Sequence, residues 1–231
     1  MSSRISVIIP ALNEQESIGY VVSSLPRDVI SECIVVDNGS TDRTAETAVR
    51  AGARVINSPR GFGAAMYAGS HAAVPTSDIL VFLDGDGSDD VADMTRLLGP
   101  VERGEADFVL GSRIRGQRER GSMLGSQVFA GHLIGFLVRL FYGFRYTDMG
   151  PFRVIRRECL ERMQMTEMTY GWNLEMQIKA IHGGLRILEV PVNYRRRIGG
   201  KSKVSGDLTA SIKAALRIFS VLFRARRRGR G

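Results

Sequence analysis

The sequence predicts an α/β protein built on a mostly parallel, doubly wound sheet. Short β-branched and apolar runs alternate with longer segments of helical pattern through the first half of the chain, as in successive strand–helix units. Polar turns follow the expected strands near Asn13, Asp37 and Asp84. Because the carboxyl ends of parallel strands meet at one edge of a sheet, these turns are expected to line one crevice. The 231 residues, 44% of them hydrophobic, suffice for one domain with a sizeable core.

The first half of the chain supplies the regular strand–helix alternation. Ile5 to Ile9 is a β-branched run that predicts the first strand, and Pro10 is expected to end it. The stretch 11–25 is expected to be a loop that enters a helix. Further strands are expected at 33–36, 54–56, 79–83 and 108–110, and further helices at about 44–51, 62–73 and 91–98.

Beyond Arg113 the pattern changes. Residues 115–121 form a basic, glycine-containing loop, and Met123 to Phe144 is mostly apolar. Glycines interrupt this apolar run, so it predicts a core or interfacial helix rather than a membrane span. Shorter elements follow, with a strand expected at 152–155, a helix at 173–182 and a strand at 187–194.

The C-terminal stretch has an amphipathic pattern. Asp207 to Arg226 predicts a helix with apolar residues on one side, and a cluster of arginines follows. This pattern is typical of a helix at a membrane surface, but equally of a helix docked on the domain with a solvated tail. We therefore divide the chain into a main domain, residues 1–206, and a C-terminal amphipathic helix and basic tail, residues 207–231.

Composition excludes several classes of protein. Cys33 and Cys159 are the only cysteines, without a CxxC pair, which argues against a disulfide scaffold or a zinc site and favours a reducing compartment. The apolar run near the N-terminus is too short for a signal peptide or a membrane span. The net charge of +8, with basic clusters at 195–203 and 224–230, fits nucleic acid, an anionic membrane or phosphorylated small molecules alike.

The most informative stretch is LVFLDGDGSDD, residues 80–90. An apolar strand pattern ends there in four carboxylates, and two glycines allow a sharp turn. Asp84 and Asp86, one residue apart on such a turn, can both reach one Mg²⁺ or Mn²⁺ ion, which prefers oxygen ligands and often bridges to substrate phosphates. The alternative is an acidic, solvated turn that caps the next helix. The position after a buried strand favours the metal site.

Two further turns carry weaker signals. Asp37 ends a strand in VVDNGSTDRT, where it can accept from a nucleobase or a ribose, although an N-cap turn explains the same residues. The loop RGFGAA, residues 60–65, enters a helix and can present backbone N–H groups to a phosphate. Glycine and alanine chosen for tight packing are an equally good explanation of this loop.

Taken together, these motifs carry a resemblance. The order VIIPALNE, VVDNGSTDRT, RGFGAAMYAG, FLDGDGSD, GSR, TDMGPFR, EVPVNYRRR and GGKSK resembles family-2 glycosyltransferases, and more closely the dolichol-phosphate-mannose-synthase-like polyprenyl-phosphate sugar transferases. The resemblance covers about Ile5 to Lys203. It implies the nucleotide-diphospho-sugar transferase fold called GT-A for the main domain, inversion at the sugar, and use of Mg²⁺ or Mn²⁺.

The resemblance also implies roles for individual residues. Pro10, Ala11 and Glu14 would border the nucleobase pocket. Asp37 and the loop residue Gly63 would bind the nucleotide sugar, Asp84 would contact ribose or metal, and Asp86 would ligate the metal. The donor diphosphate or acceptor phosphate would be held by Arg113, Arg197 and Lys203, with Asp148 in the acceptor loop.

Three positions depart from the family pattern. The family usually reads Asp-x-x-Ser-Gly-Phe-Arg where this chain has TDMGPFR, so the acceptor loop is expected to differ. The family often has Tyr at the position of Ala11 and Gln at that of Ser88. The sugar and base of the donor, a UDP- or GDP-hexose, therefore stay open.

The physical chemistry of the transfer fits the same residues. The leaving diphosphate gains charge, which a metal together with Arg and Lys would stabilise. A phosphate acceptor is largely ionised near neutral pH and attacks without a base. A hydroxyl acceptor needs a base, for which Asp148 and Glu175 are the candidates, whereas the scattered histidines His71, His132 and His182 are given no role.

The expected function is transfer of a hexose from a nucleotide sugar to polyprenyl phosphate by an enzyme peripheral to the cytoplasmic face of a membrane. One alternative is a soluble transferase of the same fold that glycosylates a hydroxyl of a sugar or small molecule. The other is a non-catalytic, basic nucleotide- or nucleic-acid-binding module. The acidic edge LDGDGSDD argues against a nucleic-acid partner, because it repels a phosphate backbone.

Overall fold

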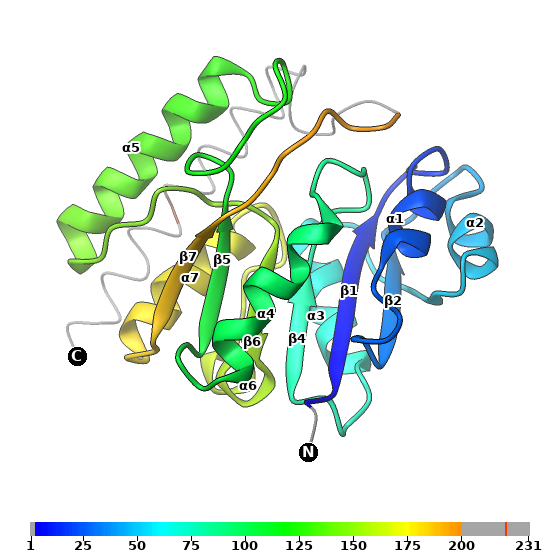
Figure 1. Ribbon diagram of the computed structural model, residues 1–231, viewed down its shortest axis with the longest axis horizontal. Helices are drawn as coiled ribbons and strands as arrows, with labels where there is room; N and C mark the ends of the chain where they lie inside the picture. The colour runs from blue at the N-terminus through cyan, green and yellow to red at the C-terminus, as the bar shows by residue number, and fades with distance from the viewer. Residues whose placement is uncertain (1–2, 200–219, 221–231) are drawn as a thin grey trace.

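A seven-stranded sheet forms the centre of the molecule (Figure 1). The computed structural model describes residues 3–199 and residue 220, so Lys203 and the helix predicted over 207–226 lie outside the described residues. The strand order is β3-β2-β1-β4-β6-β5-β7. The strands are β1 (Ile5–Ala11), β2 (Glu32–Asp37), β3 (Arg54–Asn57), β4 (Ile79–Phe82), β5 (Phe108–Ser112), β6 (Arg153–Arg156) and β7 (Ile187–Pro191).

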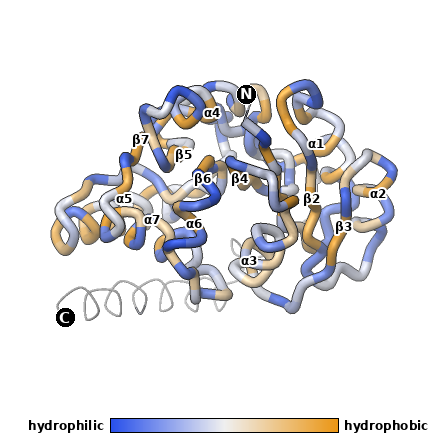
Figure 2. The backbone as a smooth tube through the Cα atoms, turned by 90° about the horizontal axis from the view of Figure 1, so that it is seen from below, coloured by the Kyte–Doolittle hydropathy of each residue, from blue (hydrophilic) through white to orange (hydrophobic). Residues whose placement is uncertain are grey.

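Helices cover both faces of the sheet, as Figure 2 shows along the sheet from below. They are α1 (Ile18–Ser24), α2 (Thr44–Arg50), α3 (Phe62–Ala72), a 3₁₀ turn η1 (Val91–Asp93) that leads into α4 (Met94–Glu102), α5 (Gly125–Tyr142), α6 (Arg157–Met163) and α7 (Trp172–His182). One apolar core lies between the sheet and α1, α2 and α4, and a second lies between the sheet and α3, α5, α6 and α7. The mostly parallel α/β sheet expected from the sequence is confirmed.

β6 departs from the parallel arrangement. It lies between β4 and β5 and runs antiparallel to both, whereas β7 returns parallel to β5. The chain between β5 and β6 holds the basic loop and α5, so the pattern of simple strand–helix alternation ends there. The N-terminal strands β3, β2, β1 and β4 pair in parallel throughout.

Three element ends and one helix in particular differ from the sequence prediction. Pro10 does not end β1, because pairing with β4 stops at Ile8 and only the β2 side continues to Ala11, where a missing N–H is tolerated. Helix α4 extends past the predicted end, through Pro100. Helix α6 was not predicted, because it follows β6 with no turn residue between them. The last strand ends at Pro191, before Tyr194.

The apolar run after the basic loop is a helix, as predicted. α5 packs through a narrow strip of Gly131, Ile134, Gly135 and Val138, and a Cβ at Gly135 would overlap the carbonyl oxygen of Tyr146. Within residues 3–199, none of the helices combines the length and apolar character needed to cross a bilayer.

Candidate active site

A cleft of about 610 Å³ opens at the carboxyl ends of β1, β2 and β4. Most of the residues expected to bind the donor and the metal line it, namely Pro10, Ala11, Glu14, Asp84, Asp86, Arg113 and Arg197. The lining also includes residues with no predicted role, among them Asn38, Arg60, Tyr170 and Asn173. The three polar turns are therefore gathered at one sheet edge, as the strand order requires.

The acidic turn after β4 shapes one wall of the cleft. The Asp86 carboxylate accepts from the backbone N–H of Ser88 at 2.9 Å and from its hydroxyl at 2.5 Å, both on Oδ1. Its other oxygen, Oδ2, lies 3.9 Å from a guanidinium nitrogen of Arg197. Gly87 has a positive φ of 77°, and a Cβ there would meet Ile198 at 2.5 Å, so only glycine suits this turn.

The carboxylates of this turn are crowded. Burial, and then the neighbouring charges of Asp86 and Asp89, raise the pKa of Asp84 well above its ordinary value. Burial likewise raises the pKa of Asp89 to about 7. One oxygen of Asp89 accepts from the Asp84 backbone N–H at 3.1 Å, and the other is buried with no hydrogen-bond partner.

This donor set suits a hard divalent cation. Across the described residues, no three His, Cys, Asp or Glu side chains gather closely enough to hold a metal by themselves. Mg²⁺ and Mn²⁺ sites often use only one or two protein carboxylates and take their other ligands from substrate phosphates and water. Asp84 and Asp86, both on the cleft wall, match that pattern, and a cation would offset the crowded negative charge around the buried Asp89.

Arg113 is held rigidly in the cleft lining, close enough for its charge to act on Asp84 and Asp89 of the acidic turn. The two carboxylate oxygens of Asp148 accept hydrogen bonds from the Arg113 guanidinium, at 2.7 Å from Nε and 2.8 Å from Nη2. Asp148 also accepts from the Arg113 backbone N–H at 2.9 Å. The Tyr194 ring lies 4.9 Å below the guanidinium. Burial alone raises the pKa of Asp148, but the hydrogen bonds and charge of Arg113 prevail and lower it. Asp148 is thus an ionised positioning group that does not itself line the cleft.

The basic segment 195–197 is tied down along the rim. Its backbone bonds to the acidic turn, from Arg195 N–H to Ser88 O at 2.8 Å and from Ile198 N–H to Asp86 O at 3.0 Å. One guanidinium nitrogen of Arg197 reaches both oxygens of Glu14, at 2.8 and 2.9 Å. A solvated charge run would show no such pairing. Arg197 is therefore positioned over the acidic turn at the mouth of the cleft.

The nucleotide side of the cleft is built from the ends of β1 and β2. Asp37 lies behind the lining, where it accepts from the Ser40 backbone N–H at 2.8 Å, which is the turn-capping geometry. Asn38 lines the cleft instead. Its carboxamide donates to Pro59 O at 2.6 Å and accepts from Gly61 N–H at 2.9 Å, which joins β2 to the rim of the 60–65 loop. The only sequence signal for Asn38 was its place beside Asp37.

Gly63 serves close packing. Its N–H donates to Thr169 O at 3.2 Å, and the next N–H, of Ala64, donates to Met168 O at 2.9 Å. A Cβ at Gly63 would overlap the carbonyl oxygen of Glu167. These N–H groups are thus bonded within the protein, which favours the packing explanation of RGFGAA over a phosphate cradle.

The second candidate base lies away from the cleft. Glu175, in the first turn of α7, accepts from the Thr166 hydroxyl at 2.6 Å and the Glu167 N–H at 2.8 Å, and pairs with Lys179 at 3.0 Å. These contacts anchor the 166–167 turn. His71, His132 and His182 do not line the cleft either.

Known proteins are similar to this chain in fold and in sequence. The fold matches the crystal structure of glucosyl-3-phosphoglycerate synthase from Mycobacterium tuberculosis in complex with phosphoglyceric acid, with a TM-score of 0.75, 26% identity, and coverage of 96% of this chain and 80% of that one. An uncharacterized glycosyltransferase of Mycobacterium tuberculosis (strain ATCC 25618 / H37Rv) is 38% identical over 222 residues, which are 94% of this chain and 97% of that protein.

A relative with a more specific name is also similar. The dolichyl-phosphate hexose transferase of Haloferax volcanii is 35% identical over 201 residues, 84% of either chain. The family model described as "Glycosyl transferase family 2" matches residues 6–163. The expected resemblance and the GT-A fold are thereby confirmed. The chain belongs to glycosyl transferase family 2.

Proposed function

We propose that this protein transfers a hexosyl group from a nucleotide sugar, a UDP- or GDP-hexose, to a polyprenyl phosphate, with inversion at the sugar carbon. The observation that carries the proposal is the gathering of opposite charges in one cleft. Asp84 and Asp86 line it together with Arg113 and Arg197, and Arg197 lies 3.9 Å from Asp86. That arrangement suits a substrate with a diphosphate leaving group and an anionic acceptor, because carboxylates that can hold a cation stand beside arginines that can bind phosphate oxygens.

The residues of the chain would act on the two phosphate groups. Arg113, which Asp148 fixes in orientation, presents its remaining guanidinium N–H groups to an oxyanion without having to reorganise. Arg197 would place positive charge close to the negative charge that develops on the leaving diphosphate. Asp84 and Asp86 would hold Mg²⁺ or Mn²⁺, which supplies Lewis-acid stabilisation of the leaving group when bound.

Both candidate bases, Asp148 and Glu175, are engaged in hydrogen bonds and ion pairs, which supports a phosphate acceptor. A hydroxyl acceptor requires a free base within hydrogen-bond reach of the acceptor proton. Both oxygens of Asp148 are bonded to Arg113, and Glu175 is bonded to Thr166 and Lys179. A phosphate monoester, whose second pKa is about 6, attacks without giving up a proton. The name of the Haloferax volcanii relative points to the same class of acceptor.

A polyprenyl phosphate lies in a membrane, so the enzyme would work at a membrane surface. We place it at the cytoplasmic face, where nucleotide sugars are available, as a peripheral protein. The tail predicted over 207–231, which lies outside the described residues, would assist through its arginines and its apolar helical side.

The test is a transfer assay with purified protein. Radiolabelled UDP- and GDP-hexoses would be supplied with Mg²⁺ or Mn²⁺ and polyprenyl phosphate in detergent. We expect labelled lipid that mild acid cleaves, formed only when the metal is present. Chelation with EDTA, followed by restoration with excess Mg²⁺, is the control for metal dependence.

A soluble acceptor is the second candidate. It is favoured by the structural likeness to a glucosyl-3-phosphoglycerate synthase, and by a cleft that is open to solvent. Metal-dependent hydrolysis of the nucleotide sugar without labelled lipid would select this candidate. Salt-sensitive binding of DNA or RNA without any turnover would select a non-catalytic module instead.

A further inference from the structure

Helix α5 leaves most of its apolar surface uncovered. Its buried residues are confined to one strip, whereas the opposite side carries large exposed side chains at helical spacing. The exposed fractions are 69% for Phe129, 38% for Leu133, 61% for Phe136 and 62% for Leu140. We call these four side chains the α5 stripe. A helix that is apolar on its outer side as well as its inner side requires a second apolar environment.

The charges around the α5 stripe have one sign. Residues 120–147 contain no Asp or Glu, and their only Lys or Arg residues are Arg120, Arg139 and Arg145. All three arginines are exposed and flank the helix, with Arg120 before its first turn and the other two at its end. The nearest carboxylate before this segment, Glu119, pairs with Arg196 at 3.5 Å. An apolar face bordered by arginines, on a segment without carboxylates of its own, is the pattern of a helix that lies in the plane of a membrane interface.

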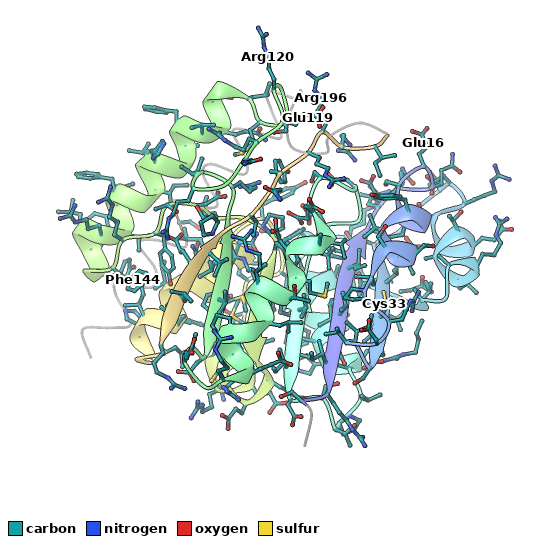
Figure 3. All side chains as sticks on the ribbon, viewed as in Figure 1. Glu16, Cys33, Glu119, Arg120, Phe144 and Arg196 are labelled. Atoms are coloured by element: carbon teal, nitrogen blue, oxygen red, sulfur yellow. The ribbon has the colours of Figure 1, made fainter. Side chains whose placement is uncertain are left out.

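The helix lies on the same side of the molecule as the loops that form the cleft rim. In Figure 1, α5 flanks the β7 end of the sheet, and its first turn lies at the level of the loops after the strands. Figure 3 shows Arg120 and Arg196 projecting from that rim away from the body of the protein. The backbone carbonyl of Arg120 accepts from Arg196 Nε at 2.7 Å, so the loop before α5 is joined to the segment that carries Arg197.

We infer that the α5 stripe is a membrane-binding surface that inserts into the interface of a bilayer containing anionic lipids. Phe129, Leu133, Phe136 and Leu140 enter the boundary between headgroups and acyl chains, while Arg120, Arg139 and Arg145 contact lipid phosphates. The inference deepens the proposed function and rests on it only for the identity of the acceptor. It assigns a specific element to membrane contact and predicts dependence on lipid charge.

A bilayer fits this face better than either protein occupant. In a symmetric dimer the same patch meets itself, so two α5 faces would bring their arginines together with no carboxylate from 120–147 to offset them. The helix predicted over 207–226 is expected to have an apolar side, but the sequence at 224–230 is also basic. Only an anionic surface supplies both an apolar layer and the complementary charge.

The experiment measures vesicle binding by the full chain without any substrate. Sedimentation is compared for vesicles of phosphatidylcholine alone and for vesicles that also contain phosphatidylglycerol. We expect the wild-type protein to bind the anionic vesicles more tightly, and binding to weaken with salt. A triple variant with Phe129→Ser, Phe136→Ser and Leu140→Ser should lose about tenfold or more in partition coefficient, because three exposed side chains no longer enter the bilayer.

The control variant carries Val49→Ser and Leu188→Ser, which are also exposed apolar positions but lie on α2 and β7. It should bind vesicles like the wild type. Equal binding by the triple variant and the wild type, or no binding by the wild type, would overturn the inference. So would a dimer that the triple variant converts to monomer without a change in vesicle binding. Hexosyl transfer in detergent is scored separately, so its failure counts against the proposed function and leaves the membrane result intact.

Discussion

Two arginines of the cleft are each held by a carboxylate. Asp148 binds Arg113 through two guanidinium nitrogens, whereas Glu14 binds Arg197 at one nitrogen, with contacts of 2.7–2.9 Å in both pairs. The two-nitrogen contact fixes the plane of the Arg113 guanidinium and leaves its other N–H groups available. The acidic turn lacks such an internal partner for Asp89, which is where a cation would act.

Asp86→Asn tests the metal role at the residue scale. The substitution keeps the shape but removes a charged oxygen ligand, so transfer should fall about 100-fold or more, and added Mg²⁺ or Mn²⁺ should not restore it. The thermal midpoint should not drop, because one of several crowded negative charges is removed. Asp28→Asn, an exposed carboxylate outside the cleft, is the control. A variant that remained active without metal would refute the assignment.

Asp148→Asn tests whether Asp148 positions Arg113. Breaking a buried ion pair should lower the free energy of unfolding by about 3 kcal/mol. Because the folded-state pKa of Asp148 lies below its ordinary value, the wild-type contribution is full above about pH 4 and is lost as the pH falls. The control, Glu105→Gln, removes a pair with Arg103 of the same two-bond geometry at an exposed site and should leave stability unchanged. Urea unfolding at pH 7 and at about pH 3, below the ordinary carboxyl pKa, measures both variants.

The sequence alone identified those site residues whose type is unusual at their position in the strand–helix pattern. The carboxylates after β4 stood out because an apolar strand rarely ends in four of them, and two of the four, Asp84 and Asp86, line the cleft. Asn38 and Tyr194 were missed, because an amide and a phenol in a loop have no distinctive spacing. Asp148 was placed near the reaction, but its grip on Arg113 depends on two segments far apart in the chain.

At the scale of elements, glycine residues allow two helices to approach neighbouring backbone closely. α3 approaches the 167–169 backbone so closely that two of its N–H groups bond there, and α5 approaches Tyr146 at Gly135. In α3 the glycine and alanine residues indicated close packing without naming the neighbour, whereas the glycines of α5 were interpreted only as interruptions of an apolar run. The strand ends were harder to predict, since Pro10 and Tyr194 depend on which neighbouring strand continues beside them.

Gly63→Ala and Gly131→Ala form a matched pair on two helices. The first places a methyl group against the Glu167 carbonyl and should cost about 2 kcal/mol of stability. The second meets nothing within 4 Å inside α5, so it should raise stability by up to about 1 kcal/mol through helix propensity. Urea midpoints distinguish the two outcomes. A loss at both positions would mean that α5 packs more tightly than described.

At the scale of the molecule, the sheet separates two apolar cores, and each contains one cysteine. Cys33 belongs to the core beside α1, and Cys159 belongs to the core beside α7. The composition predicted a sizeable core, and the alternation of strands and helices predicted a mostly parallel sheet. It did not predict the two-sided division or the antiparallel β6, because both depend on where the chain returns after α5.

The two thiols report on the two cores. Burial raises the pKa of Cys33 to about 12 and also raises that of Cys159, so little thiolate is present at pH 8. An aromatic disulfide reagent should therefore label neither thiol in the folded protein within minutes, and should label both on unfolding in urea. Cys33→Ala and Cys159→Ala identify which core opens first. Rapid labelling of either thiol in the absence of urea would contradict the packing described for that core.

The insertion of β6 between β4 and β5 has a consequence for synthesis on the ribosome. When β5 emerges, the strand that joins it to β4 has not yet been made, because α5 and the basic loop come first. The nascent chain therefore holds a paired N-terminal half, β1 to β4, whose β4 edge is open, and a separate β5. Unpaired apolar strand edges are sites of misassociation. Nascent chains that stall between Ser112 and Arg153 should accordingly be the ones that need a chaperone, and release should follow once β6 closes the gap.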